Sequence, residues 1–173
     1  SDCGGAIATD SVVITETLPD SWTQIADFGG GERHSAVSFS IGSKGYIGTG
    51  VDGAATNKKD FWEWNQASNT WTQKADFGGT ARYKAIGFSV GAKGYIGTGY
   101  DSNSDYKNDF WEWDTATNVW SQKAGFGGTP RELAVGFSIG PKGYIGTGTN
   151  GILDYNDLYE FCLLTLNSAK TNI

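Results

Sequence analysis

The sequence predicts an all-β fold made of three repeated four-stranded units. The 173-residue chain contains a block that returns three times at a nearly constant spacing. Short apolar stretches within each block alternate with glycine-containing turns, and the apolar periodicity of a helix is missing. The 26 glycines also oppose helices, because glycine loses more conformational freedom in a helix than any other residue.

Three motifs mark the repeat. Trp22-Thr-Gln-Ile-Ala-Asp-Phe-Gly-Gly30 returns at Trp71 and Trp120, with spacings of 71 − 22 = 49 and 120 − 71 = 49 residues. Lys44-Gly-Tyr-Ile-Gly-Thr-Gly50 returns at residues 93–99 and 142–148. Asp60-Phe-Trp-Glu-Trp64 returns at 109–113 and, 157 − 109 = 48 residues later, as Asp157-Leu-Tyr-Glu-Phe161. Residues 22–70 and 71–119 are identical at 29 of 49 positions.

Each repeat divides into four expected strands. In the first repeat these are Arg33–Ile41, Gly45–Gly50, Asp60–Trp64 and Thr70–Phe77, and the polar loop Val51–Lys59 separates the second strand from the third. Four strands in a repeat of about 50 residues are typical of a propeller blade.

At these residues the chain resembles the kelch family of β-propeller repeats. The resemblance lies in the first-strand arginine, the Gly-Tyr-Ile-Gly-Thr-Gly strand, the Asp-Phe-Trp-Glu-Trp strand and the tryptophan that follows. Kelch repeats usually carry two adjacent glycines, whereas Thr49, Thr98 and Thr147 separate them here. The variant is similar to the kelch-type repeats of secreted bacterial surface proteins, which implies an extracellular or cell-surface location.

The kelch-like region, residues 21–162, lies between an N-terminal extension, 1–20, and a C-terminal tail, 163–173. The third repeat contains only three strands, because the tail holds no counterpart of Trp120. Ser21–Phe28 matches a fourth strand with no repeat in front of it. We therefore expect this N-terminal strand to complete the third blade, since propellers commonly join both termini in one blade.

Three blades leave the outer faces of the end blades exposed, because propellers typically have about 4–8 blades. Two chains closing a six-bladed ring, an open head-to-tail fibre, or a fragment of a longer propeller would each resolve this. The near-identical repeats favour the first two. The β-branched segment Val12, Val13, Ile14 and Thr15 lies outside the repeat, and would cover its own edge or add to a neighbour's sheet.

Composition excludes several classes of protein. A net charge of −6 and a pI near 4.6 disfavour nucleic acid as a partner, because a phosphate backbone would be repelled. No apolar run is long enough to predict a membrane span. The chain contains no Met, so we expect Ser1 to follow processing or truncation. Cys3 and Cys162 would form a disulfide in an oxidising compartment, within or between chains, or remain buried thiols in a reducing one.

Two groups of residues are candidate binding sites. Arg33, Arg82 and Arg131 recur at the start of the innermost strand, and would form a ring that binds a carboxylate or, alternatively, bridge structurally to a neighbouring blade. Asp101, Asn103 and Asp105 suggest a weak calcium loop, with Asp109 and Glu112 as further ligands. Tyr106 stands where such a loop needs glycine.

Catalysis and cofactors are not predicted. The copper oxidases of the kelch family need two histidines, whereas His34 is the only one here and is expected at a variable rim. Neither a Ser-His-Asp set nor a phosphate-binding loop is present. The four tryptophans of the third strands have two interpretations, a sugar-stacking platform or packing between blades. They are Trp62, Trp64, Trp111 and Trp113.

The sequence therefore predicts a secreted, non-enzymatic structural or adhesive protein that self-associates through its end blades and N-terminal strand, as an extracellular fibre. A second interpretation is a two-chain ring that binds or isomerises carbohydrate, as the sialic-acid mutarotases of the kelch family do, with surface glycans as partners. A third is a scaffold fragment of a larger surface protein.

Overall fold

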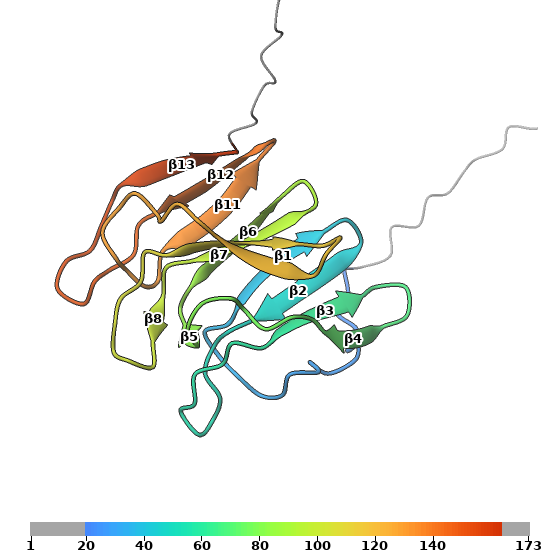
Figure 1. Ribbon diagram of the computed structural model, residues 1–173. Coiled ribbons are helices and arrows are strands. Elements are labelled where there is room, and N and C mark those ends of the chain that lie inside the picture. Colours follow the sequence, from blue (N-terminus) through green and yellow to red (C-terminus); the bar gives the residue numbers. More distant parts are fainter. Residues whose placement is uncertain (1–19, 164–173) are drawn as a thin grey trace, which may run out of the picture.

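The computed structural model describes residues 20–163, and every regular element among them is a β-strand. Three antiparallel sheets follow one another along the chain, and each packs face to face on the next (Figure 1). The predicted all-β class is confirmed, and the described sheets form an open array.

The strands of each sheet are hydrogen-bonded in chain order. The first sheet contains β1 (Val37–Ile41), β2 (Lys44–Gly48), β3 (Phe61–Asn65) and β4 (Thr70–Gln73). The second contains β6 (Ile86–Val90), β7 (Lys93–Gly97), β9 (Phe110–Asp114) and β10 (Val119–Lys123). The third contains β11 (Val135–Ile139), β12 (Lys142–Gly146) and β13 (Leu158–Cys162). A short ladder, β5 (Arg82–Tyr83) with β8 (Tyr100–Asp101), joins the segments before β6 and after β7.

The first strand of each repeat is shorter than its sequence suggests. The expected strand Arg33–Ile41 begins only at Val37, because Ser35 has a φ of 53°. Lys84 and Leu133 have φ values of 53° and 57° at the same place in the other repeats. A residue in the left-handed region interrupts a strand, so the arginine precedes each first strand instead of belonging to it.

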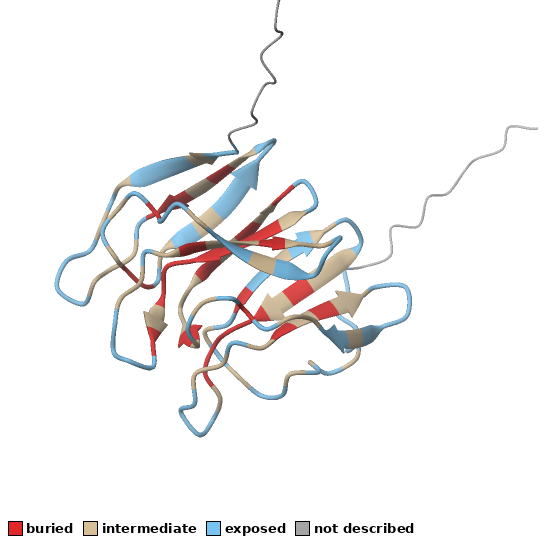
Figure 2. Cartoon of the chain, in the orientation of Figure 1, coloured by how far each residue is buried: buried red, intermediate tan, exposed pale blue. Residues whose placement is uncertain are grey.

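The core consists of two apolar layers between adjacent sheets (Figure 2). Alternate residues of β6 point to opposite sides: Gly87 faces Val37 of the first sheet, and Phe88 faces Gly136 of the third. One layer joins the first and second sheets around Phe61 and Trp113. The other joins the second and third around Phe88 and Tyr95. Each sheet is thus held to the next by side chains that follow the period of the repeat.

The prediction that Ser21–Phe28 completes the third sheet of the same chain is wrong. The third sheet has three described strands, and residues 21–28 form none. The end of this segment is attached instead to the first sheet, where the Ala26 N–H donates to Asn69 Oδ1 at 3.1 Å and Phe28 packs on Trp71. The second sheet separates the first from the third, so the segment lies at the opposite end of the array (Figure 1).

Candidate functional site

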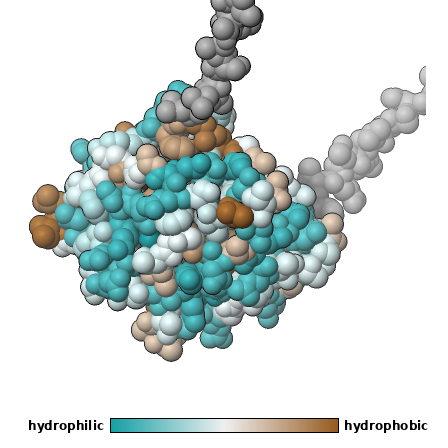
Figure 3. All heavy atoms as spheres, viewed as in Figure 1, coloured by the Kyte–Doolittle hydropathy of each residue, from teal (hydrophilic) through white to brown (hydrophobic). Residues whose placement is uncertain are grey.

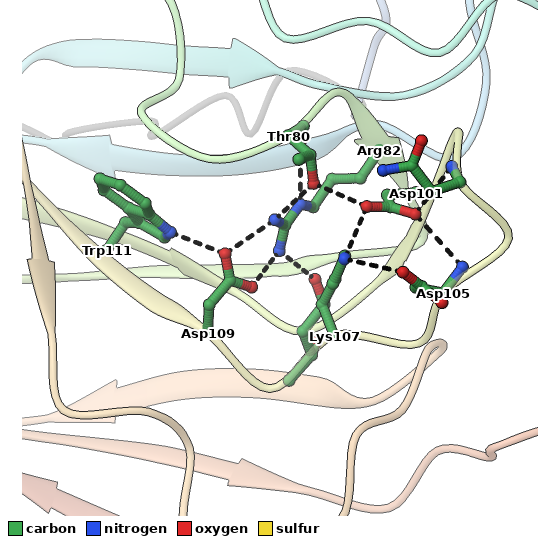
Figure 4. Close-up of polar contacts among 9 residues, drawn as sticks. Thr80, Arg82, Asp101, Asp105, Lys107, Asp109 and Trp111 are labelled. Atoms are coloured by element: carbon green, nitrogen blue, oxygen red, sulfur yellow. Dashed lines mark hydrogen bonds and ion pairs between the residues drawn. The ribbon is translucent and has the colours of Figure 1, made fainter.

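The side chains of the three repeated arginines are at most 3% exposed and lie in hydrogen-bond networks, of which that of Arg82 is complete (Figure 4). Its Nη1 donates to Asp109 Oδ1 at 2.5 Å and to the Thr98 carbonyl at 2.9 Å. Its Nη2 donates to Asp109 Oδ2 at 2.8 Å and to Thr80 Oγ1 at 3.0 Å, and Nε donates to the Thr80 carbonyl. All five N–H groups of the guanidinium are therefore used within the protein.

Arg33 and Arg131 repeat this arrangement with Asp60 and Asp157. Each arginine lies over the phenylalanine that precedes it in the repeat, as Arg82 does over Phe77, with 4.9 Å from Cζ to the ring centre. The structural interpretation foresaw carboxylates or carbonyls of a neighbouring blade, whereas the side chain of each arginine is paired with an aspartate of its own repeat. The buried guanidinium groups present no open side to a carboxylate ligand, so the geometry does not support an anion-binding ring.

The aspartates of these pairs remain charged at neutral pH. Burial opposes the charge of Asp109, but hydrogen bonds from Arg82 and Trp111 outweigh it and hold the pKa below its ordinary value of 3.8. The same balance, with Arg33 as the main donor, lowers the pKa of Asp60. A hydrogen bond from Arg131 is the main cause of the lowered pKa of Asp157.

The loop that suggested calcium is held by a lysine. Asp101 is buried, and its Oδ1 accepts the backbone N–H groups of Asn103 and Asp105 at 2.9 and 3.2 Å. Its Oδ2 lies 2.7 Å from Lys107 Nζ, so an ammonium group already neutralises the carboxylate (Figure 4). Asp109, a further ligand of the calcium interpretation, is paired with Arg82 instead.

The same holds for the last calcium ligand, Glu112, which accepts a hydrogen bond from Tyr95 and lies 3.1 Å from Lys123. Within residues 20–163 no cluster of three or more acidic, histidine or cysteine side chains is arranged to hold a metal ion. The geometry therefore does not support the calcium loop.

The tryptophans of the second sheet pack between sheets. Trp113 is buried, with its ring centre 5.1 Å from Tyr46 and 5.0 Å from Phe61 of the first sheet. Trp111 packs edge-on against Phe77. Their counterparts Trp62 and Trp64 are half-buried, on the side of the first sheet that no other described sheet covers. His34 is exposed at a loop, where its backbone pairs with that of Val51.

The third sheet presents an apolar face that no described sheet covers. We use the term tail face for its outward-pointing side chains Val135, Phe137 and Ile139, which are 52, 41 and 63% exposed. Their counterparts in the second sheet are at most 6% exposed, because the third sheet covers them. Hydrophobic residues gather over this end of the molecule, at the top of Figure 3. The three residues of the second sheet are Ile86, Phe88 and Val90.

The outward face of the first sheet, at the other end of the array, is a shallow groove. We use the term head face for the outward side of β1 and β2, where Ser38, Gly45 and Ile47 line a shallow groove flanked by Trp64 and Trp71. At the matching positions of the second sheet, Gly94 receives the ring of Phe39. The head face thus has the shape that accepts a tail face inside the array.

Two predicted elements of self-association lie outside the described residues. These are the segment Val12, Val13, Ile14 and Thr15, and Cys3. Cys162, the other half of the predicted disulfide, is exposed at the end of β13, and its thiol donates to Glu160 Oε1 at 3.1 Å. The disulfide therefore stays a prediction.

Comparison with protein families and with curated proteins identifies no relative. No protein-family model matches the sequence, and the curated proteins include none that is significantly similar to it. Among the described residues, no helix has the length and apolar character needed to cross a membrane. The function must therefore be argued from the end faces, which sequence reasoning foresaw in general but did not assign to residues.

Proposed function

We propose that this chain is a structural repeat protein that self-associates through the end faces of a kelch-like, propeller-type array. The extracellular setting and the fibre are part of this proposal and rest on the sequence. The observation that carries it is the contrast between Phe137 and Phe88. The two residues occupy the same place in the repeat, yet Phe137 is 41% exposed and Phe88 only 3%.

Covering the tail face with a partner would lower the free energy of the protein. Fully burying an apolar side chain stabilises by roughly 1.5–3 kcal/mol, so covering three half-exposed ones contributes on the order of 3 kcal/mol. Stacked repeats bury their apolar faces only against neighbours, and a terminal repeat normally carries a polar outer face. The tail face lacks such a polar cap among the described residues, which supports a partner of similar shape.

A second copy of the chain has that shape. The head face differs chemically from the tail face, so a contact between them is heterologous and leaves one free face of each kind. Repetition of this contact gives either a ring or a fibre. The buried arginines offer no comparable support for the carbohydrate-binding alternative.

The experiment compares Phe137→Asp with Phe88→Asp by sedimentation and by circular dichroism. We expect wild-type chains to associate with increasing concentration, and Phe137→Asp to remain folded while associating more weakly. Phe88→Asp, the matched control, buries a charge in the core and unfolds the chain. A wild-type chain that stays monomeric at every accessible concentration would refute the proposal.

A further inference from the structure

An apolar cavity of about 180 Å³ lies between the second and third sheets. Its walls are mainly apolar and include four aromatic side chains, and an apolar cavity of about 150 Å³ is large enough to accept benzene. The cavity therefore has the size and character to take up an aromatic side chain. The residues that line it include Phe110, Ala124, Phe126, Gly127, Tyr159 and Phe161.

The corresponding space between the first and second sheets is filled by Trp120. Its ring centre lies 5.2 Å from those of both Phe61 and Phe77, and its Nε1 donates to the Ala75 carbonyl at 3.1 Å. Adding the 49-residue spacing turns these three partners into Phe110, Phe126 and Ala124, which line the cavity. The cavity is therefore the equivalent, one repeat later, of the space that Trp120 fills, and we call it the seat of a tryptophan.

No described strand of the third sheet occupies the fourth position, which is the position that would supply the tryptophan. Trp120 belongs to β10, which pairs with β9 so that Trp120 lies opposite Trp113. In the third sheet, β13 pairs with β12 and has no second described partner. The counterpart of Trp113 is Phe161, and the residue 120 + 48 = 168 is serine.

A glycine beside the cavity also indicates that a tryptophan belongs there. A Cβ atom placed on Gly78 would lie 2.9 Å from Trp120 Cβ, and one placed on Gly29 would lie 2.8 Å from Trp71 Cβ. These glycines let the tryptophan backbone approach closely. A Cβ on Gly127, the third member of the series, would meet only the Tyr159 ring at 3.5 Å. Position 127 thus keeps the small residue that a neighbouring tryptophan needs, although no described strand of the third sheet supplies that tryptophan.

The chain also carries one tryptophan, Trp22, that occupies no such cavity. Trp22 precedes Trp71 by 71 − 22 = 49 residues, and its side chain is fully exposed. The residues that follow it hold to the first sheet, since Trp71 Nε1 donates to the Ala26 carbonyl. Trp120 and Ala75 form the same bond one repeat later. Trp22 therefore has the place in the repeat that belongs to the fourth strand of a sheet preceding the first one.

We infer that residues 21–25 of a second copy form the fourth strand of the third sheet, with Trp22 in the cavity. The strand pairs with β13, Trp22 lies opposite Phe161, and its indole N–H donates to the Ala124 carbonyl. This inference rests on the proposed function and names the segment that joins two copies. It also places the head face of the second copy against the tail face of the first, because the chain passes directly from Phe28 into the first sheet.

Backbone groups at the two ends are complementary in the same way. Inside the array, Gly50 and Gly99 each donate an N–H to the carbonyl of the next arginine, Arg82 and Arg131, at 2.8 Å. Gly148 at the tail end donates to no described carbonyl, and the Arg33 carbonyl at the head end accepts from no described N–H group. A second copy in the repeat position brings these two groups together.

The test measures association of the full chain by analytical ultracentrifugation for wild type, Trp22→Lys and Gly127→Val. Trp22→Lys removes the inserted side chain, and Gly127→Val blocks its seat. We expect each variant to associate about 100-fold more weakly, since losing a buried tryptophan costs several kcal/mol. Both should melt as the wild-type monomer does, because Trp22 is exposed and Gly127 has room. Gly78→Val is the matched control that should disrupt the fold.

Mixing provides the decisive measurement. Trp22→Lys retains the seat and Gly127→Val retains the tryptophan, so the mixture should form a two-chain species that neither variant forms alone. If both variants assemble as tightly as a self-associating wild type, the inference fails while the proposed function stands. If Trp22→Lys has no effect and Gly127→Val lowers the melting temperature, the chain's own tail fills the cavity and the inference is also refuted. A monomeric wild type refutes both.

Discussion

Phe39 and Gly94 are in contact across the first two sheets, and a Cβ atom on Gly94 would lie only 2.3 Å from Phe39 Cζ. The ring of Phe39 thus takes the space that any other residue at 94 would need. Phe88 lies against Gly143 in the same way, at 2.2 Å. A phenylalanine on one sheet and a glycine on the next are therefore the recurring contact that sets how closely the sheets stack.

Gly94→Val is expected to destabilise the chain by about 3 kcal/mol, because the added side chain overlaps a packed ring. Gly45→Val is the matched control on the head face, where a Cβ would meet only Trp64 at 3.7 Å. Urea denaturation of dilute protein measures both. Equal loss of stability in the two variants would contradict the stacking role of this contact.

Arg82→Lys is expected to cost about 3–5 kcal/mol, because it breaks a buried bidentate pair and leaves Asp109 poorly compensated. A lysine keeps the charge but cannot supply the five N–H groups that the network uses. The free energy of unfolding, from guanidinium titration, measures the loss. Lys93→Arg serves as control, since Lys93 and its partner Asp114 are both partly exposed, with side chains 33 and 28% exposed. A loss below 1 kcal/mol for Arg82→Lys, of the size of a surface pair, would disprove the role of the network.

Acid should destabilise the fold as the pH falls below about 4. The folded-state pKa values of Asp60, Asp109 and Asp157 lie below the ordinary value of 3.8, so folding favours their charged forms. Their contribution is complete above the unfolded-state pKa and is lost as the pH falls through the folded-state values. Urea midpoints measured from neutral to acidic pH follow this loss.

Asp109→Asn provides the control for this pH dependence. It should lower stability at neutral pH and flatten the decline below about pH 4, because one of the depressed carboxyl groups is gone. An unchanged slope would show that other groups govern acid unfolding.

The predicted Cys3–Cys162 disulfide can be checked by a non-reducing peptide map. Cys162 is exposed and accessible to a partner. We expect a linked peptide pair, and we expect Cys3→Ser to lower stability by on the order of 4–5 kcal/mol if the link is within one chain. Rapid alkylation of both thiols in unreduced protein would exclude it.

The second and third strands of each repeat were predictable because their information is local. Gly45–Gly50 and Asp60–Trp64 were placed within a few residues of β2 and β3 from alternating apolar residues and flanking turns. The break at Ser35 was not, because a left-handed φ at serine leaves no mark in an apolar pattern.

The pairing of Arg82 was predicted only in kind. A repeated arginine indicates a repeated partner, but Asp109 is 109 − 82 = 27 residues away, and its identity depends on how the sheet brings two loops together.

The amino-acid order established the repeat and the all-β class, and it placed a fourth-strand motif at Trp22 with no repeat in front of it, since all three follow from residue spacing. The folded arrangement settled which copies of a motif are covered: Val135 and Ile86 are interchangeable in pattern, yet one is exposed and the other buried. Burial depends on which face of a sheet a neighbouring sheet covers, and a residue pattern that is the same in every repeat does not tell which face of an end sheet points outward.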